Sequence, residues 1–359
     1  MDTNGFSRRE FMKVGGISLA ATTVALNFGS KVFAASSKTS FGSVQFAVIT
    51  DPHVDIQGTN AIKMSAISLD CVQKTVDALN MEKDLSFVMV TGDLLQDGEW
   101  ENARAIKKEL DRLKAPYYVL AGNHDYDPIL PKKHREGFTY MTIEEFVEFF
   151  KGHGYDDSLQ RYYALQIKPG LRVIALDAEL PLDPKSWAGV VPAEQLEWLD
   201  KQLADHPNDL NLVCLHHNFV TWSDDELKGG PKQRFCIENA AEVREVLAKH
   251  STAAPVAISG HRHIGLNYKE LNGVNYFIAP ALNSHPMRYT IFDITNEAIS
   301  WKTPMVGVPL SAHLEAKENL LNAEWWRESK YKERNYVNDN GVLNLYENND
   351  MIIGSKKIS

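Results

Sequence analysis

Five short polar motifs, each placed directly after an apolar run, constrain this 359-residue chain more than any other feature. They supply aspartate, asparagine and histidine, whose oxygen and nitrogen atoms are donors that borderline divalent metal ions accept. A lone Asp-x-His or Gly-Asp is usually a turn, so the argument depends on the complete ordered set. The motifs are Asp51-Pro52-His53, Gly92-Asp93, Gly122-Asn123-His124-Asp125, His216-His217 and Gly260-His261-Arg262-His263. Together they predict a metal site.

The apolar runs before these motifs predict buried strands. They are short and rich in β-branched residues, which is the pattern of strands covered on both faces. Open α/β sheets bind ligands at the carboxyl ends of their strands, where these polar motifs stand. The runs are 44–50, 87–91, 117–121, 210–215 and 256–259.

The intervals between the motifs predict alternating helices and strands. Helical apolar spacing occurs in 61–80, 99–113, 192–203 and 238–250. After Gly260 the pattern changes to short strands at 264–271, 275–278, 289–294 and 299–302, and Asn272-Gly273 is a hairpin turn signal. The sequence therefore predicts the α/β class.

The ordered motifs resemble the signature of the calcineurin-like metallophosphoesterase superfamily, which runs D-x-H, G-D, G-N-H-[D/E], H and G-H-x-H. The resemblance spans about residues 44 to 294 and includes every block. It implies a four-layer sandwich of two mixed β-sheets flanked by helices, with a catalytic domain over 41–309. Residues 310–359 would form a C-terminal helical extension, helix-prone over 312–334, whose Trp325-Trp326 we expect to pack onto the domain or a second subunit.

The resemblance also implies two divalent transition metal ions. Mn, Fe and Zn all suit a nitrogen and oxygen ligand set without thiolate. Two cations about 3.5–4 Å apart lower the pKa of a shared water and clamp phosphoryl oxygens, so that a metal-bridging hydroxide attacks phosphorus. One ion would be held by Asp51, His53, Asp93 and His263, and the other by Asp93, Asn123, His216 and His261, with Asp93 as the bridge.

His124 is implied as the catalytic histidine, because in the superfamily this residue is not a ligand. It is then available to protonate the leaving oxygen or to stabilise charge. In some relatives an aspartate three residues after the Gly-Asp aspartate orients this histidine. Here Gln96 occupies that position and Asp97 follows it, so an Asp–His pair is not predicted. Gln96 also disfavours the purple acid branch, which has a metal-binding tyrosine there.

Softer similarities, in 161–199 and 238–241, point to the cyclic-nucleotide phosphodiesterase branch. Our first hypothesis is a phosphodiesterase of cyclic nucleotides or glycerophosphodiesters, with a phosphomonoesterase on the same centre as the alternative and a nuclease third. An exported metal-binding protein without turnover is a different class, and His124 argues against it.

Long stretches at 126–155 and 219–235 could shape substrate choice. Candidate substrate-binding residues are His217, Trp222 and Asn239.

The net charge limits which classes of substrate the protein can bind. The chain carries −9, and residues 1–34 carry four cations against two anions, so the remainder carries −11. This acidity argues against long nucleic acid as a substrate, since duplex binding needs many cation–phosphate contacts. A small anionic phosphoester stays compatible, because bound metal ions provide a local positive field.

The amino end predicts export. Ser7-Arg8-Arg9-Glu10-Phe11-Met12-Lys13 resembles the twin-arginine motif, a mildly apolar stretch over 14–28 follows, and 32–34 offer small residues for cleavage. We expect a signal peptide over 1–34, export by the twin-arginine machinery, and a periplasmic or extracellular location. The alternative is an uncleaved anchor, but the stretch is shorter than the ~20 residues that span a bilayer. The three cysteines predict no disulfide framework.

Overall fold

A computed structural model describes residues 38–127, 134–182, 188–222, 235–323 and 345–358. The predicted signal peptide, Trp325-Trp326 and most of 219–235 lie outside these residues. Among the helices in these ranges, none combines the length and the apolar character that a membrane span requires.

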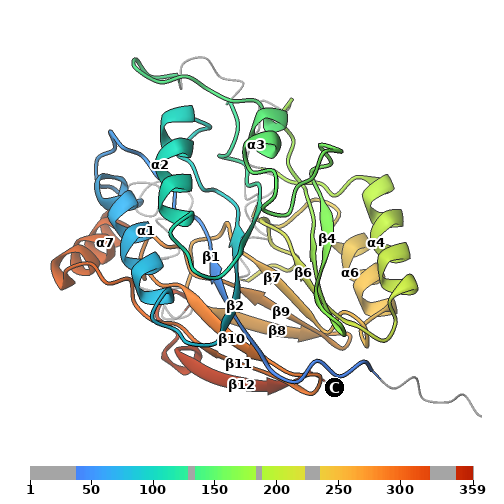
Figure 1. The fold of residues 1–359 in the computed structure, drawn as a ribbon. Helices are drawn as coiled ribbons and strands as arrows, with labels where there is room; N and C mark the ends of the chain where they lie inside the picture. Colours follow the sequence, from blue (N-terminus) through green and yellow to red (C-terminus); the bar gives the residue numbers. More distant parts are fainter. Residues whose placement is uncertain (1–37, 128–133, 183–187, 223–234, 324–344, 359) are drawn as a thin grey trace, which may run out of the picture. The chain divides into compact units, whose positions relative to one another are not determined.

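Two six-stranded mixed sheets form the centre of the described part (Figure 1). The first has the order β12-β11-β10-β1-β2-β3 and the second β4-β5-β6-β7-β9-β8. The first sheet comprises β1 (Val44–Ile49), β2 (Leu85–Thr91), β3 (Tyr117–Leu120), β10 (Thr290–Ile294), β11 (Ala298–Lys302) and β12 (Ile353–Lys357). The second comprises β4 (Tyr163–Lys168), β5 (Leu171–Ala175), β6 (Leu210–Cys214), β7 (Val256–Ser259), β8 (Asn267–Leu271) and β9 (Val274–Ile278).

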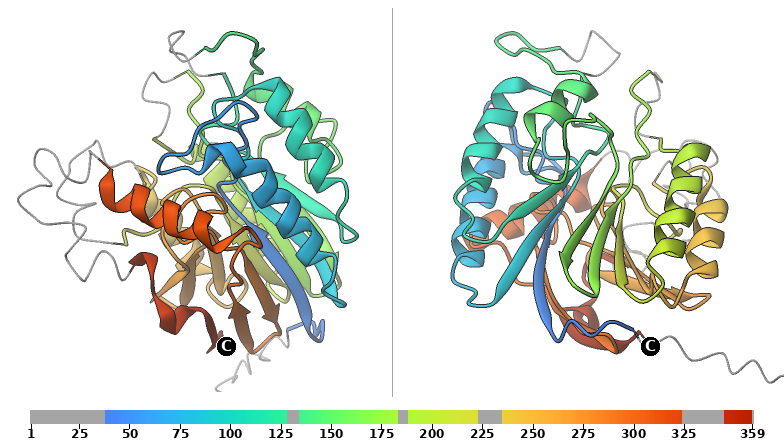
Figure 2. Two further views of the ribbon diagram at one scale, coloured as in Figure 1. Left: turned by 90° about the vertical axis from the view of Figure 1, so that its left-hand side faces the viewer. Right: turned by 45° about the vertical axis from the view of Figure 1, so that its right-hand side comes forward.

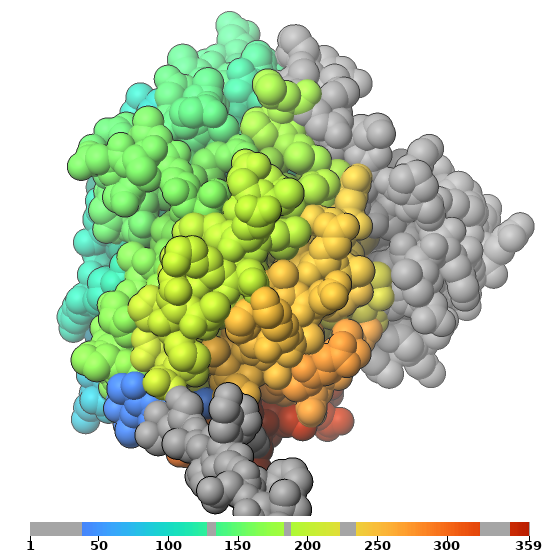
Figure 3. All heavy atoms as spheres, turned by 90° about the vertical axis from the view of Figure 1, so that its right-hand side faces the viewer, coloured from blue at the N-terminus to red at the C-terminus, as the bar shows by residue number. Residues whose placement is uncertain are grey.

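Helices flank the two sheets on both sides, so the prediction of two mixed sheets between helices is confirmed (Figure 2). One side carries α1 (Ser68–Leu79) and α2 (Trp100–Leu110), and the other carries α4 (Ala193–Asp205) and α6 (Ala240–Lys249). Figure 3 looks onto the face covered by α4 and α6, in yellow-green and yellow-orange. The short α3 (Ile143–Phe149) follows the third motif, and α7 (Leu310–Asn322) follows the last strand but one.

The side chains of strand β6 and of the residue after it alternate between the two faces of the second sheet. Successive residues of a strand point to opposite faces of the sheet. Leu212 and Cys214 belong to the core that the two sheets share, whereas Val213 and Leu215 belong to the cluster under α4 and α6. All four are at most 2% exposed, which explains why this run is continuously apolar rather than alternating.

The C-terminal segment contains a strand as well as a helix. α7 lies where a helix was predicted, but β12 pairs antiparallel with β11 at the edge of the first sheet. The Trp301 indole donates to the Met351 carbonyl at 3.1 Å, which joins β11 to the turn before β12. Only a helical extension was predicted here, and the additional last strand completes a sheet that begins near the other end of the chain.

α7 also supports a loop beside the carboxyl end of β1. The Asn60 amide donates to Glu315 at 2.9 Å, and the Asn319 amide donates to the Ala61 carbonyl at 3.0 Å. Residues 60–64 thereby rest on the helix before the chain enters α1. This loop carries Lys63.

Candidate metal centre

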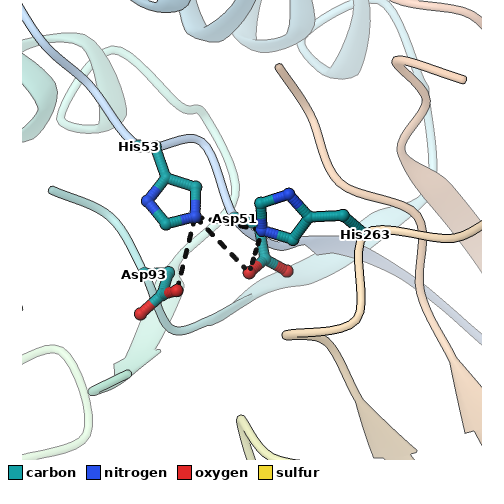
Figure 4. A group of neighbouring side chains, drawn as sticks. All are labelled: Asp51, His53, Asp93 and His263. Carbon is teal, nitrogen blue, oxygen red and sulfur yellow. Dashed lines mark hydrogen bonds and ion pairs between the residues drawn. The ribbon is translucent and has the colours of Figure 1, made fainter. Parts of the chain in front are cut away.

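The carboxyl ends of five strands from both sheets bring the predicted ligands together. β1, β2 and β3 deliver the first three motifs, while β6 and β7 deliver the two histidine motifs. Asp51, His53, Asp93 and His263 form one group (Figure 4), and Asp93, His216 and His261 form a second. Within each group the candidate ligand atoms lie within 4.8 Å of one another.

Asp93 belongs to both groups through one carboxylate oxygen. Its Oδ2 lies 3.3 Å from His53 Nε2 and 3.3 Å from His216 Nε2. Its Oδ1 accepts the backbone N–H of His124 at 2.9 Å, which fixes the orientation of the carboxylate. This placement suits a ligand shared between two cations.

The side-chain oxygen of Asn123 is buried and lacks a hydrogen-bond donor among the described residues. The residue is 6% exposed, and its Oδ1 has no hydrogen-bond partner among the described residues. Burying an amide oxygen without a partner is unfavourable, and native structures rarely leave one so. A cation beside Asp93 would satisfy it, since amide oxygen suits divalent ions. The residues present therefore fit divalent metal ions.

The candidate imidazole ligands are oriented by hydrogen bonds on their far side. His53 Nδ1 lies 3.2 Å from the Leu95 carbonyl, and His216 Nδ1 lies 2.8 Å from the Thr91 carbonyl. His263 Nδ1 lies 3.1 Å from Ser284 Oγ. In each ring these contacts leave Nε2 facing the group, as for metal-bound histidines whose other nitrogen is held by a neighbour.

The backbone of these loops is held in an unusual conformation. Left-handed φ values are uncommon outside glycine and concentrate at functional sites. They occur at Asp51 (51°), His53 (39°), Asp93 (52°), His261 (70°) and His263 (53°). The motif glycines allow the close packing, because a Cβ on Gly92 would lie 2.5 Å from His216 Nδ1 and one on Gly260 would lie 2.0 Å from Thr50 Oγ1.

The electrostatics couple the two carboxylates to the imidazoles. Burial alone would raise the pKa of Asp51 and of Asp93, but His263 and His216 hold both pKa values below the usual range. Burial alone would lower the pKa of His216, yet Asp93 raises that pKa to about 10. The carboxylates of Asp51 and Asp93 therefore attract positive charge, and metal ions compete with protons for the imidazole nitrogens beside them.

His124 stands beside the ligands with its ring held by an acidic partner. Its Nδ1 lies 2.6 Å from the Gln96 carbonyl and 2.9 Å from Asp97 Oδ1. The pattern did not predict this Asp–His pair, because the expected position holds Gln96. The chain supplies the carboxylate one residue later. His124 Nε2 is left for the reacting groups, with Lys63 Nζ at 3.5 Å.

The three proposed substrate-binding residues have other surroundings. His217 is buried behind His261, with ring centroids 4.2 Å apart, and its Nδ1 lies 3.2 Å from Glu179. Trp222 is 6% exposed and packs in the cluster under α4 and α6. Asn239 Oδ1 accepts the Val191 N–H at 3.1 Å and its Nδ2 donates to the Val191 carbonyl at 2.8 Å. His217 thus packs against the candidate ligand His261, whereas these contacts of Trp222 and Asn239 are with other parts of the chain.

Lys63 and Glu179 were not predicted, and Asp97 was predicted only as a neighbour of the expected position. Lys63 and Glu179 stand outside the recognised motifs, so no local pattern marks them. Asp97 could have been found by allowing the orienting carboxylate to shift by one residue.

Comparisons with known proteins agree with this geometry. The family model described as calcineurin-like phosphoesterase matches residues 44–265, more than half of the chain. A 3',5'-cyclic adenosine monophosphate phosphodiesterase, CpdA of Escherichia coli K12, is 24% identical over 72% of this chain and 84% of its own length. A probable glycerophosphodiester phosphodiesterase, GpdQ of Arcobacter nitrofigilis, is 27% identical over 47% of this chain and 55% of its own length.

A solved structure supports the fold independently. The dimetal phosphatase from Danio rerio has a TM-score of 0.54 and 18% identity, and the match covers 72% of this chain and 95% of that one. With the family model matched from β1 to β7 and every block of the motif set in place, this chain belongs to the calcineurin-like phosphoesterase family and is a metal-dependent phosphoric ester hydrolase.

Proposed function

We propose that this protein is an exported phosphodiesterase of small substrates, of the cyclic nucleotide or glycerophosphodiester type, working with two divalent transition metal ions. The observation that best supports the binuclear centre is the position of Asp93 Oδ2, which lies 3.3 Å from a histidine nitrogen of each group. The diester preference is supported by relatives that are named as diesterases of these two substrate types.

Each side chain has a defined part in the proposed hydrolysis. Ions held by Asp51, His53, Asp93 and His263, and by Asp93, Asn123, His216 and His261, would neutralise phosphoryl charge and make water nucleophilic near neutral pH. Water attacks phosphorus directly. His124 Nε2 donates a proton to the departing alkoxide, while Asp97 and the Gln96 carbonyl hold Nδ1 and stabilise the positive ring.

The export part of the proposal rests on residues 7–34. Twin-arginine export moves folded proteins, which suits an enzyme that must acquire a chosen metal before it leaves the cytoplasm. Metal choice follows availability as well as affinity, so the compartment of loading matters.

One assay tests the proposed activity. The purified protein, loaded with manganese, is compared on bis(p-nitrophenyl) phosphate and on p-nitrophenyl phosphate. We expect a higher kcat/KM on the diester. A higher value on the monoester would replace the diesterase with a phosphomonoesterase on the same centre, and no turnover of either would contradict the proposal.

A further inference from the structure

Lys63 is fixed beside the centre by its own backbone. It forms an antiparallel bridge with Ser284, and the N–H of the next residue, Met64, donates to the Asn283 carbonyl at 2.7 Å. Ser284 is the residue whose hydroxyl lies 3.1 Å from His263 Nδ1. Lys63 is therefore attached to the loop that orients a candidate ligand, and its loop also rests on α7.

The ammonium group of Lys63 lies at the reacting edge of His124. Its Nζ is 3.0 Å from His53 Nδ1 and 3.5 Å from His124 Nε2. His124 Nδ1 is already engaged by Gln96 and Asp97, so Nε2 is the nitrogen that a substrate can approach. A group that reaches this nitrogen comes within reach of the ammonium as well.

Charge explains what such a lysine is suited to bind. Placing a cation beside a centre that holds two dications raises the electrostatic free energy, because like charges repel across short distances. An anion bound between them reverses the sign of that contribution. Lysine is a compact point charge with three donors and is a common phosphate ligand.

We propose that Lys63 is a substrate-positioning residue whose ammonium binds a phosphoryl oxygen of the ester next to His124. This inference rests on the proposed function for the identity of the anion. The contribution of Lys63 to the binding free energy grows with the charge of the ligand, so a dianion gains more affinity than a diester monoanion. Diester hydrolysis yields a phosphomonoester with that second charge, so Lys63 also strengthens retention of the product.

The test uses three variants of the full chain loaded with manganese. Lys63→Met removes the charge, Lys63→Arg keeps it, and Lys83→Met is the matched control, because Lys83 is exposed in the turn after α1. We measure metal content, the midpoint of thermal unfolding, KM and kcat on bis(p-nitrophenyl) phosphate and on an alkyl phosphodiester, and the Kd of inorganic phosphate by calorimetry. Inorganic phosphate reports binding without turnover.

We expect Lys63→Met to raise both KM and the phosphate Kd by about 10- to 100-fold, the usual worth of one charge-assisted hydrogen bond. Metal content, unfolding midpoint and kcat on this substrate should stay within twofold or a few degrees of the wild type. Lys63→Arg should keep most of the affinity, and Lys83→Met should match the wild type.

Three results would overturn the inference. An unchanged phosphate Kd in Lys63→Met would mean that the ammonium does not bind the phosphoryl group. A kcat loss confined to alkyl esters would mean that Lys63 acts through His124, and a loss of metal would make it part of the centre. If the wild type failed to hydrolyse the diester, the proposed function would fail, while the phosphate Kd would still decide the role of Lys63.

Discussion

In the proposed binuclear centre, Asp93 is the residue on which both ions depend. Asp93→Asn replaces an anionic oxygen shared between His53 and His216 with a neutral, weaker ligand. We expect this variant to lose both ions, because neither position keeps a bridging anion to offset the repulsion between dications. Metal analysis after dialysis checks this, with exposed Asp84→Asn as the control. Two retained ions per chain would contradict the shared-ligand role.

The choice of leaving group can distinguish proton donation by His124 from the metal-binding role of the candidate ligands. His124→Ala should keep both ions and lose about 10²–10⁴-fold in kcat on alkyl phosphodiesters, the typical contribution of a positioned general acid. The loss should shrink on p-nitrophenyl esters, since that leaving group needs little protonation. Steady-state kinetics on both ester types provide the check. Equal losses on the two would assign His124 to charge stabilisation instead of proton donation.

At the level of elements, the sequence was most informative where strands are buried on both faces. The runs before the five motifs match β1, β2, β3, β6 and β7 closely, because burial on both sides forces continuous apolar residues. The hairpin also formed as predicted, with Asn272 at φ 53° and Gly273 at φ 79° between β8 and β9. The local signal there is a backbone requirement that few other residue pairs satisfy.

Among the elements that were missed, β4 and β12 lie at sheet edges and α3 is short, whereas β5 (Leu171–Ala175) is a fully buried inner strand. β12 and β4 each have one neighbour, so half-exposed polar residues replace the apolar run. α3 is only seven residues long, although its capping box, Thr142 with Glu145, was visible in the sequence. In the site, the ligand motifs were local and could be predicted. Lys63 reaches His124 through the tertiary fold, which no local pattern encodes, whereas Asp97 follows the Gly92-Asp93 motif one residue later than the expected position.

The attachment of β12 can be tested at one glycine. A Cβ on Gly354 would lie 2.4 Å from the Trp301 ring, so Gly354→Val forces the strand or the indole to move. We expect a destabilisation of about 1–3 kcal/mol, typical of overpacking, with metal content unchanged. Thermal unfolding measures it, and Ser355→Val on the exposed face of the same strand is the control. Equal midpoints for the two variants would show that β12 adapts without loss.

At the scale of the whole chain, the export prediction concerns Arg8 and Arg9. Replacing both with lysine keeps the positive charge but removes the paired guanidinium groups, so we expect the precursor to stay in the cytoplasm. Cell fractionation measures this, and amino-terminal sequencing of the exported wild type should begin near Ala35. A sequence starting at Met1 would instead support the uncleaved anchor.

The order of strands in the first sheet sets when the protein can fold. β1 lies between β2 and β10, and its residue Val44 pairs with Ile294. During synthesis the first strand can pair with β2 early, but its second partner, β10, is made some 250 residues later, and β12 follows only at 353–357. Such distant pairings slow folding, since a long loop must close before the contacts form. The loops that carry Asp51 and His261 follow β1 of the first sheet and β7 of the second, so the candidate ligands come together only when strands of the two sheets have packed against each other.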